Sequence, residues 1–189
     1  MKTKHILTIV LILTISSVVR AQFLDDIYVG VGWQQGTYNG LSWDLNYIHL
    51  DKYSLQLRAS GGSRKATNAP QDSKKIFREN YNAFELQIGR VYRLNNSGSI
   101  TSNLKTGLAY NFFKHPIRYE RNYGGISFFG ETSSRYKAEF NMEKNLGLVI
   151  NPSIKIHLFK RFYFAIAPYI NVNSYRMAYE GQVRLIYRN

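Results

Sequence analysis

Five charged residues recur at positions where polar side chains alternate with large apolar ones: Asp44, Arg58, Glu85, Lys105 and Arg184. Two of these side chains are acidic and three are basic, so they could form ion pairs with one another. A charge that is removed from water is costly unless it is paired. If the five side chains share one interior, we therefore expect a network of ion pairs and hydrogen bonds among them.

A second group contains the residue types of a nucleophilic hydrolase. His115 is followed by a set of hydroxyl and carboxyl side chains at Ser127, Glu131, Ser133 and Ser134. Such groups act together only within hydrogen-bond reach, which spacing along the chain does not establish. The chain has neither a Gly-x-Ser-x-Gly nor a His-x-Ser-Asn element. We expect His115 to be a solvated loop residue, and we assign no catalytic residue.

Metal and cofactor chemistry have little support in the residue inventory. The chain has no cysteine, which excludes disulfides, thiolate zinc sites and cysteine nucleophiles. Its four histidines have no paired spacing, and it has no glycine-rich phosphate-binding loop. We expect no metal site and no cofactor.

Basic and aromatic residues interleave in two long segments, 61–80 and 113–143, whose Gly, Ser, Asn and Pro content predicts loops. The candidate binding residues in these segments are Lys74, Lys75, Arg78, Lys114, Arg118, Arg121 and Tyr123. One interpretation is a solvated loop surface. The other is a patch that contacts phosphate groups or another acidic ligand.

The composition describes one folded domain. The 189 residues are 44% hydrophobic and 15% aromatic, and 25 Lys and Arg oppose 12 Asp and Glu for a net charge of +13. This apolar content argues against disorder, and a mean hydropathy of −0.31 argues against a helical membrane protein. Outside the cytoplasm, such a basic protein is better suited to anionic lipid headgroups or acidic glycans than to nucleic acid.

The first 21 residues have the pattern of a secretory signal peptide. Lys2 and Lys4 precede an apolar run over 6–15, and Ala21 is a small residue at the expected cleavage point. The apolar run is about half of the ~20 residues that a spanning helix requires. We predict residues 1–21 to be a signal peptide and residues 22–189 to form the exported domain.

Apolar and polar residues alternate with period two in the rest of the chain, which predicts an all-β fold. Eight such segments occur, at 27–34, 41–47, 53–60, 84–93, 100–112, 146–158, 162–173 and 181–187. Connections near 51, 96 and 160 are short, whereas 61–80 and 113–143 would both lie at the opposite end. An even number of strands with short turns at one end is typical of a closed antiparallel up-and-down transmembrane β-barrel.

The composition of the two stripes favours a membrane over water. The polar stripe mixes Gly and Ala with amides and few charges, whereas the exterior of a soluble protein is usually rich in Lys and Glu. Aromatic residues stand near the strand ends, as in interfacial girdles, at Tyr47, Tyr53, Tyr92, Phe112, Phe162 and Tyr187. A soluble exported barrel that binds a hydrophobic ligand inside remains the alternative.

The leader, the eight amphipathic strands, the short turns and the lack of cysteine together resemble the small outer-membrane β-barrels of the OmpA/OmpX type. The resemblance implies an outer-membrane location and a structural or surface-interaction role. An eight-stranded ring leaves room only for side chains, so we expect a polar, plugged lumen in a monomer. The expected partners are outer-membrane lipid and lipopolysaccharide or another surface ligand at the outer loops. A lipid-modifying enzyme is the less favoured alternative.

Overall fold

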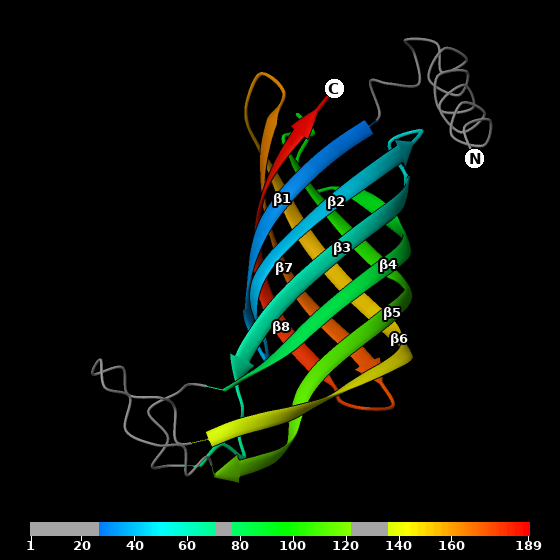
Figure 1. Cartoon of the computed structure of the whole chain (residues 1–189). Helices are drawn as coiled ribbons and strands as arrows, with labels where there is room; N and C mark the ends of the chain where they lie inside the picture. The colour runs from blue at the N-terminus through cyan, green and yellow to red at the C-terminus, as the bar shows by residue number, and fades with distance from the viewer. Residues whose placement is uncertain (1–26, 71–76, 122–135) are drawn as a thin grey trace, which may run out of the picture.

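The computed structural model describes residues 27–70, 77–121 and 136–189, and the regular structure in these ranges is entirely β (Figure 1). The strands are β1 (Ile27–Gly36), β2 (Asn39–His49), β3 (Tyr53–Lys65), β4 (Arg78–Arg93), β5 (Ile100–Arg121), β6 (Tyr136–Phe159), β7 (Phe162–Asn173) and β8 (Ala178–Arg188). Each predicted segment lies inside one of these strands. Among the described residues, no helix has the length and apolar composition needed to span a bilayer.

The eight strands form one closed antiparallel ring in chain order. Closure is made by β1, which pairs with β2 on one side and with β8 on the other, from Tyr28↔Arg188 to Gly36↔Glu180. Because both ends of the sheet are joined, the ring has no edge strand along its length. The predicted all-β, eight-stranded closed barrel is therefore confirmed.

Short turns connect the strands at the end of the barrel where the chain ends (Figure 1). Leu50 and Asp51 between β2 and β3 have positive φ, and so do Gly98 between β4 and β5 and Lys160 between β6 and β7. This left-handed backbone allows a strand to reverse within a few residues. We call this end the turn end, and the opposite end the loop end.

The two predicted long loops are shorter than expected. β3 continues to Lys65 and β4 begins at Arg78, while β5 continues to Arg121 and β6 begins at Tyr136. The ends of β5 and β6 form a two-stranded ribbon that projects beyond the ring (Figure 1). Both faces of this ribbon carry polar residues, so period two is lost there. Its register shifts between Pro116 and Arg118, next to the proline that cannot donate to the ladder.

The barrel is polar inside and apolar outside. Along β1 the outward side chains of Val29, Val31 and Trp33 are about half exposed, at 48%, 59% and 54%. The largest fully buried side chains instead include Arg58 and Arg184. The expected orientation of the two stripes is therefore observed.

An apolar cluster lies inside the ring near the turn end. Alternation continues through Arg90 and Val91 at the end of β4 without a register shift. Val91 points inward and packs with Tyr28, Ile48 and Ile186. The interior is therefore apolar only close to this end and in smaller clusters elsewhere.

Candidate functional site

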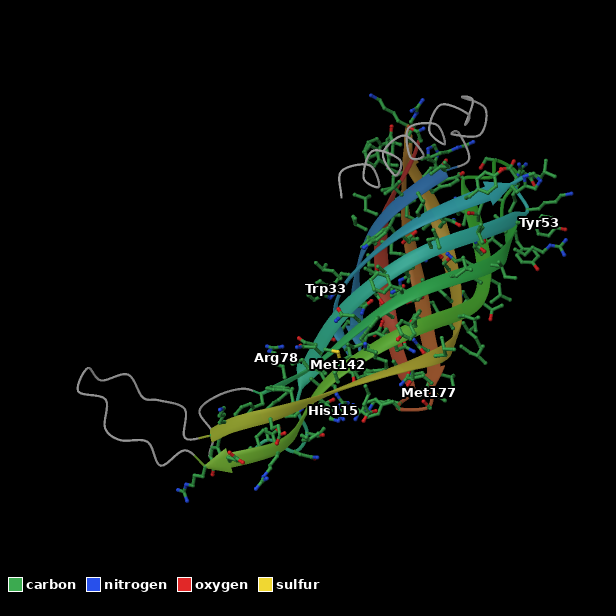
Figure 2. All side chains as sticks on the ribbon, turned by 45° about the vertical axis from the view of Figure 1, so that its right-hand side comes forward. Trp33, Tyr53, Arg78, His115, Met142 and Met177 are labelled. Carbon is green, nitrogen blue, oxygen red and sulfur yellow. The ribbon has the colours of Figure 1, made fainter. Side chains whose placement is uncertain are left out.

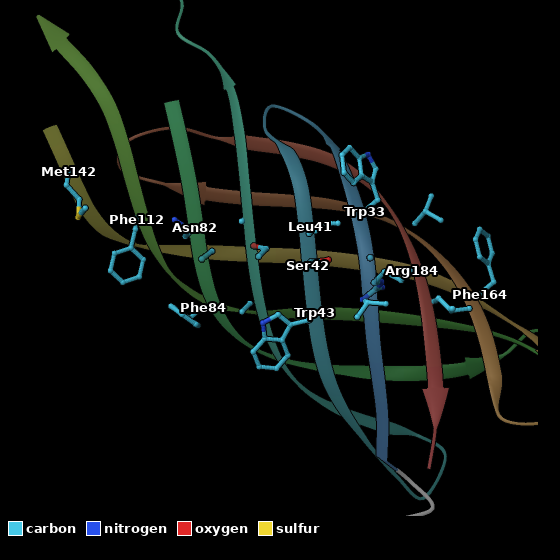
Figure 3. A pocket seen from close by; sticks show the side chains of 18 residues that line it. Trp33, Leu41, Ser42, Trp43, Asn82, Phe84, Phe112, Met142, Phe164 and Arg184 are labelled. Atoms are coloured by element: carbon cyan, nitrogen blue, oxygen red, sulfur yellow. The ribbon is translucent and has the colours of Figure 1, made fainter. Parts of the chain in front are cut away.

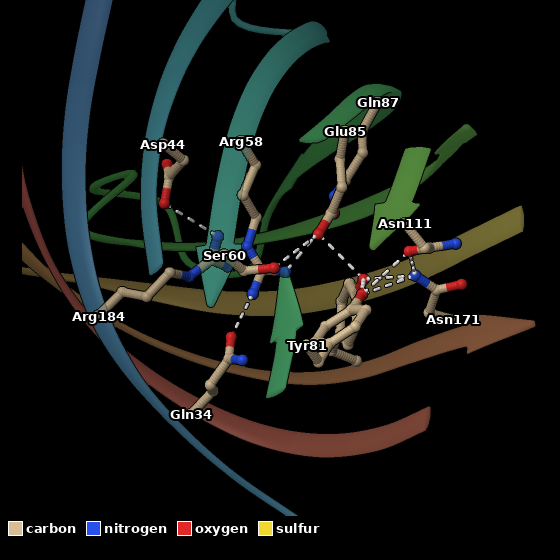
Figure 4. A network of polar contacts seen from close by, with 11 residues as sticks. Gln34, Asp44, Arg58, Ser60, Tyr81, Glu85, Gln87, Asn111, Asn171 and Arg184 are labelled. Atoms are coloured by element: carbon tan, nitrogen blue, oxygen red, sulfur yellow. Dashed lines mark hydrogen bonds and ion pairs between the residues drawn. The ribbon is translucent and has the colours of Figure 1, made fainter. Parts of the chain in front are cut away.

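Arg58 and Glu85 form the centre of a buried polar network inside the barrel (Figure 4). The two residues are cross-strand partners on β3 and β4, and Arg58 Nη1 lies 3.7 Å from Glu85 Oε2. Arg58 also donates a hydrogen bond of 3.0 Å to Gln34 and stands 4.5 Å above the ring of Tyr169. Glu85 accepts hydrogen bonds from the Tyr169 hydroxyl and from the Gln87 amide.

A second ion pair joins Asp44 of β2 to Arg184 of β8, with Nη1 3.5 Å from Oδ2. β1 lies between these strands and carries glycine at the facing positions. A Cβ on Gly32 would lie 2.5 Å from Arg184 Cγ, and one on Gly30 would lie 2.9 Å from Asp44 Oδ2. Glycine on β1 therefore makes the space in which the two long side chains meet.

Lys105 is the one predicted lumen residue that joins neither pair. Its side chain is buried and lies with Asp44 and Arg184 around a small cavity of about 20 Å³. Within the described ranges, no carboxylate oxygen lies within 4 Å of its ammonium group. The structure thus brings together four of the five residues as two pairs, with the fifth nearby.

Aromatic side chains pack against one another inside the ring at the loop end. The rings of Tyr38 and Tyr81 lie 5.1 Å apart, those of Tyr81 and Phe113 also 5.1 Å, and those of Phe113 and Tyr175 4.8 Å. Burial raises the pKa of Tyr38 to about 12. We call these four residues the aromatic plug. The plug could not be predicted from the sequence, because Tyr81 and Phe113 lie outside the segments predicted as strands, 84–93 and 100–112.

Amide and carboxylate groups surround the plug. Below it, Asn171 donates hydrogen bonds of 2.8 Å to Asn111 Oδ1 and to the hydroxyl of Tyr81 (Figure 4). Toward the loop end, Glu79 Oε2 lies 2.7 Å from Arg64 Nε and 3.0 Å from Arg176 Nη1. These paired groups hold the aromatic rings from both sides of the stack.

The residues of the predicted basic patch lie in two places, at the loop end of the ring and farther out in the ribbon. Arg78 and Lys114 lie near the loop end of the ring, where Arg78 donates to the Ser63 hydroxyl and Lys114 Nζ lies 5.1 Å from the ring of Phe140. Figure 2 shows Arg78 near the loop end of the ring. Arg118 and Arg121 lie farther along β5, in the ribbon. The remaining three patch residues, Lys74, Lys75 and Tyr123, fall outside the described residues.

Lys144 of β6 belongs to the same outer surface but was not predicted. It is exposed, and its Nζ lies 6.0 Å from the ring of Phe112. Position 144 lies between the predicted loop 113–143 and the predicted strand 146–158, so the cross-strand pairing of Lys144 with Phe112 could not be read from the sequence.

His115 is not the solvated loop residue expected from the sequence. It lies on β5, its side chain is 16% exposed, and its ring stacks on Tyr175 at 5.1 Å. Its Nε2 lies 3.9 Å from Glu143 Oε1. The hydroxyl and carboxyl groups considered with it, at Ser127, Glu131, Ser133 and Ser134, fall outside the described residues.

A hollow of about 1000 Å³ lies on the outer face of the barrel (Figure 3). Small residues on β3, Ala59 and Gly61, leave it open, while large apolar side chains border it, including Trp33, Trp43 and Phe112. The hollow is therefore an apolar groove on the surface that the ring turns outward.

Aromatic residues also ring the turn end. Tyr53, Tyr92 and Tyr187 point outward and are 55%, 46% and 38% exposed. The rings of Phe162 and Tyr187 pack against each other at 5.3 Å. An aromatic belt at this height is typical of the interfacial zone of membrane barrels.

Solved structures of bacterial outer-membrane proteins share this architecture. The chain is similar to the N-terminal β-barrel domain of Pseudomonas aeruginosa OprF, with a TM-score of 0.58 and 10% identity over 86% of this chain and 96% of that one. It is also similar to Neisserial surface protein A, with a TM-score of 0.53 and 11% identity over 87% and 97%. A third similar structure is Yersinia pestis Ail, the attachment invasion locus protein, in complex with the heparin analogue sucrose octasulfate, with a TM-score of 0.53 and 8% identity over 86% and 96%.

Neither protein-family models nor curated protein sequences match this chain. The similarity to the three solved barrels therefore lies in the fold. The chain has the fold of the small eight-stranded outer-membrane β-barrels.

Proposed function

We propose that this protein is an outer-membrane β-barrel of structural or surface-interaction type, which acts as a monomer. The observation that carries the proposal is the reversed polarity of the barrel. Leu86, Leu108 and Leu148 point outward and are 51–60% exposed, whereas Arg58 and Glu85 are buried inside. Soluble monomers seldom expose a continuous apolar surface larger than a few hundred Å². Acyl chains are the solvent that such a surface suits.

The proposed lumen is closed to solutes. The aromatic plug fills the loop end, and the Arg58–Glu85 network occupies the middle. The same interior argues against a soluble carrier, because charged and amide side chains give an apolar ligand little to contact. The proposal therefore assigns no channel and no apolar cargo to this barrel.

The proposed surface ligand is lipopolysaccharide, held from the outward face near the loop end. Arg78, Lys114 and Lys144 would contact its phosphate groups, and each cation near an anionic surface contributes about 1 kcal/mol. The hollow beside Trp43 and Phe112 would accept its acyl chains. The complex of Ail with a sulfated sugar supports the idea that this fold can bind anionic glycans.

Membrane fractionation tests the location. We expect the protein in the outer-membrane fraction, with a gel mobility in detergent that changes on boiling, because a closed barrel resists detergent until it is heated. Recovery from the soluble periplasm would overturn the proposal and favour the soluble carrier.

The lipid ligand is tested by thermal unfolding of the purified protein in detergent with and without lipopolysaccharide. We expect lipopolysaccharide to raise the midpoint of the wild type, and the triple variant Arg78→Gln/Lys114→Gln/Lys144→Gln to lose most of this shift. The control variant, Lys52→Gln, removes a cation at the turn end. An equal loss in the control would contradict the assigned site.

We propose no enzymatic activity. His115→Ala should leave the lipid composition of the outer membrane unchanged when it is measured by mass spectrometry. A lipid product that disappears in this variant would instead support the lipid-modifying enzyme.

A further inference from the structure

One arginine lies on the outward face of the barrel near the turn end, among apolar and aromatic side chains. Arg90 of β4 is exposed and stands between Ile88 and Tyr92 in the outward stripe of its strand. Across the sheet it is opposite Tyr53 of β3, which Figure 2 shows at this end, and Leu104 of β5. Arg90 therefore places a positive charge in a stripe whose other members suit lipid.

The aromatic belt places Arg90 on the bilayer side of the interface. Tyr53 and Tyr92 belong to the belt of outward aromatic residues at the turn end. With a rise of about 3.3 Å per residue and a tilt of about 40°, the Cα atom of Arg90 lies about 5 Å closer to the middle of the bilayer than that of Tyr92. A cation at this depth is destabilising unless its head reaches the interface or an anionic partner.

The protein residues around Arg90 do not supply that anion. No carboxylate oxygen of the described residues lies within 4 Å of its guanidinium group. Its Cζ lies 5.6 Å from the centre of the Tyr92 ring, which carries no net charge. Asp51 of the nearby β2–β3 turn lies 2.6 Å from Arg93 instead. The charge of Arg90 is therefore not balanced by a carboxylate in the ranges that the structure describes.

A hollow of about 810 Å³ opens on the outer surface beside Arg90. Leu55, Ile88 and Leu104 form part of its apolar border. Thr106 of β5, which lies opposite Ile88, has a short side chain and leaves the hollow open. The hollow is therefore an apolar groove that begins beside a cation.

Polar groups stand together on the turn-end side of this hollow. His49, Tyr53 and Arg90 are successive cross-strand partners on β2, β3 and β4. Residues opposite each other on neighbouring strands have Cβ atoms about 4.5–5.5 Å apart, so the three side chains form one row. The hydroxyl of Tyr47 lies 3.3 Å from Nδ1 of His49. Among the described residues, no acidic side chain lines the hollow.

We propose that Arg90 and this hollow bind an anionic phospholipid of the phosphatidylglycerol class, from the leaflet at the turn end. This inference rests on the proposed outer-membrane location. The guanidinium group of Arg90 pairs with the lipid phosphate, and the hydroxyl of Tyr53 donates a hydrogen bond to the headgroup. The acyl chains lie in the hollow along Ile88 and Leu104. An anionic lipid is favoured over a zwitterionic one, because no carboxylate in this wall would receive an ammonium group.

Lipid titration followed by native mass spectrometry tests the site. The purified protein in detergent is titrated with phosphatidylglycerol and, separately, with phosphatidylcholine that has the same acyl chains. We expect the wild type to bind phosphatidylglycerol at least fivefold more tightly. Arg90→Gln should remove this preference, whereas Arg90→Lys, which keeps the charge, should retain most of it. Equal affinities for the two lipids in the wild type, or a preference that survives Arg90→Gln, would overturn the proposal.

A control variant separates the site from the general positive charge of this end. Lys52 is exposed in the β2–β3 turn and lies outside the wall of the hollow. Lys52→Gln removes the same charge as Arg90→Gln and should change the affinity for phosphatidylglycerol less than twofold. If both variants lose the preference equally, the lipid responds to net charge alone and the assigned site is wrong.

The hollow is tested by filling it. Thr106→Phe should weaken phosphatidylglycerol binding at least fivefold, while the boiling-dependent gel shift is retained. The matched control is Thr106→Val, because the Thr106 hydroxyl donates a hydrogen bond of 3.0 Å to the carbonyl oxygen of Val149. Loss of this bond at nearly constant volume should change the affinity less than twofold. Unchanged affinity in folded Thr106→Phe would contradict the role of the hollow.

Membrane fractionation separates the failure of this inference from the failure of the proposed function. Recovery of the protein from the soluble periplasm would overturn both. Recovery from the outer membrane together with equal affinities for the two lipids would leave the proposed location intact and overturn the phospholipid site alone.

Discussion

An arginine placed on the outward face should lower the free energy of unfolding more, the closer it lies to the middle of the bilayer. The outward apolar residues of β6 run from Leu146 to Leu158, with Pro152 at the midpoint. With a rise of about 3.3 Å per residue and a tilt of about 40°, Ile150 lies about 5 Å from the midplane and Leu158 about 15 Å from it. The apolar band is about 25 Å tall, so Leu158 falls outside it.

These depths give different energies for the same substitution. Ile150→Arg should reduce the free energy of unfolding by about 2–4 kcal/mol, and Leu158→Arg by about 0–1 kcal/mol. The two native side chains are similarly exposed, at 45% and 50%, so exposure alone does not separate them. If the outer face of the barrel were in water instead of lipid, an arginine at either exposed position would change the free energy of unfolding by about 0.5 kcal/mol or less.

The assay is reversible urea unfolding of the barrel in lipid vesicles, followed by tryptophan fluorescence. Trp33 and Trp43 both point outward, so their emission reports the loss of contact with lipid. Linear extrapolation to zero urea gives the free energy for each variant. Equal costs for Ile150→Arg and Leu158→Arg, or a negligible cost for both, would refute the placement of this face against acyl chains.

Three further predictions concern the interior. Arg58→Met should lower the free energy of unfolding by about 3–5 kcal/mol, because it leaves the Glu85 carboxylate buried without its cation. In a double-mutant cycle, the variant Arg58→Met/Glu85→Gln should lose less stability than the two single variants together. Gly107→Ala should reduce the heat-shifted, folded fraction on gels because its Cβ would overlap a backbone carbonyl of β4, whereas Gly181→Ala, with its nearest atom at 3.9 Å, should fold normally. Burial raises the pKa of Tyr38 from 10.0 to about 12, so ionisation of its hydroxyl favours the unfolded chain. As the pH rises from 10 to 12, the wild type should therefore lose stability relative to Tyr38→Phe. Urea unfolding at a series of pH values measures this difference.

The strands and their outward faces were predictable because each strand separates two unlike environments. The alternation of Val29, Val31 and Trp33 with glycines on β1 is a direct result of that difference. Where the environment is the same on both faces, the signal disappears. The ribbon formed by the ends of β5 and β6 has polar residues on both faces, and for that reason the sequence predicts a loop over 113–143.

The interior contacts were predictable in kind but not in partnership. Arg58 and Glu85 could be assigned to one polar stripe, and their direct pairing follows from the β3–β4 register. The Asp44–Arg184 pair spans β1 and depends on ring closure, which joins the first and last strands. The contact between Tyr81 and Tyr169 likewise crosses the lumen between distant segments. Such contacts depend on the curvature of the ring, which local alternation does not encode.

Ring closure also makes the start of β1 and the end of β8 neighbours. The amide of Asn189 donates a hydrogen bond of 3.1 Å to the carbonyl oxygen of Ile27, at the end of the barrel that carries the short turns. A circular permutant that joins these ends with a short linker and opens the chain between Lys160 and Arg161 would keep every strand pair and every strand direction. The architecture therefore has no inherent first strand, and the order of the strands in the gene is one of several that specify the same ring.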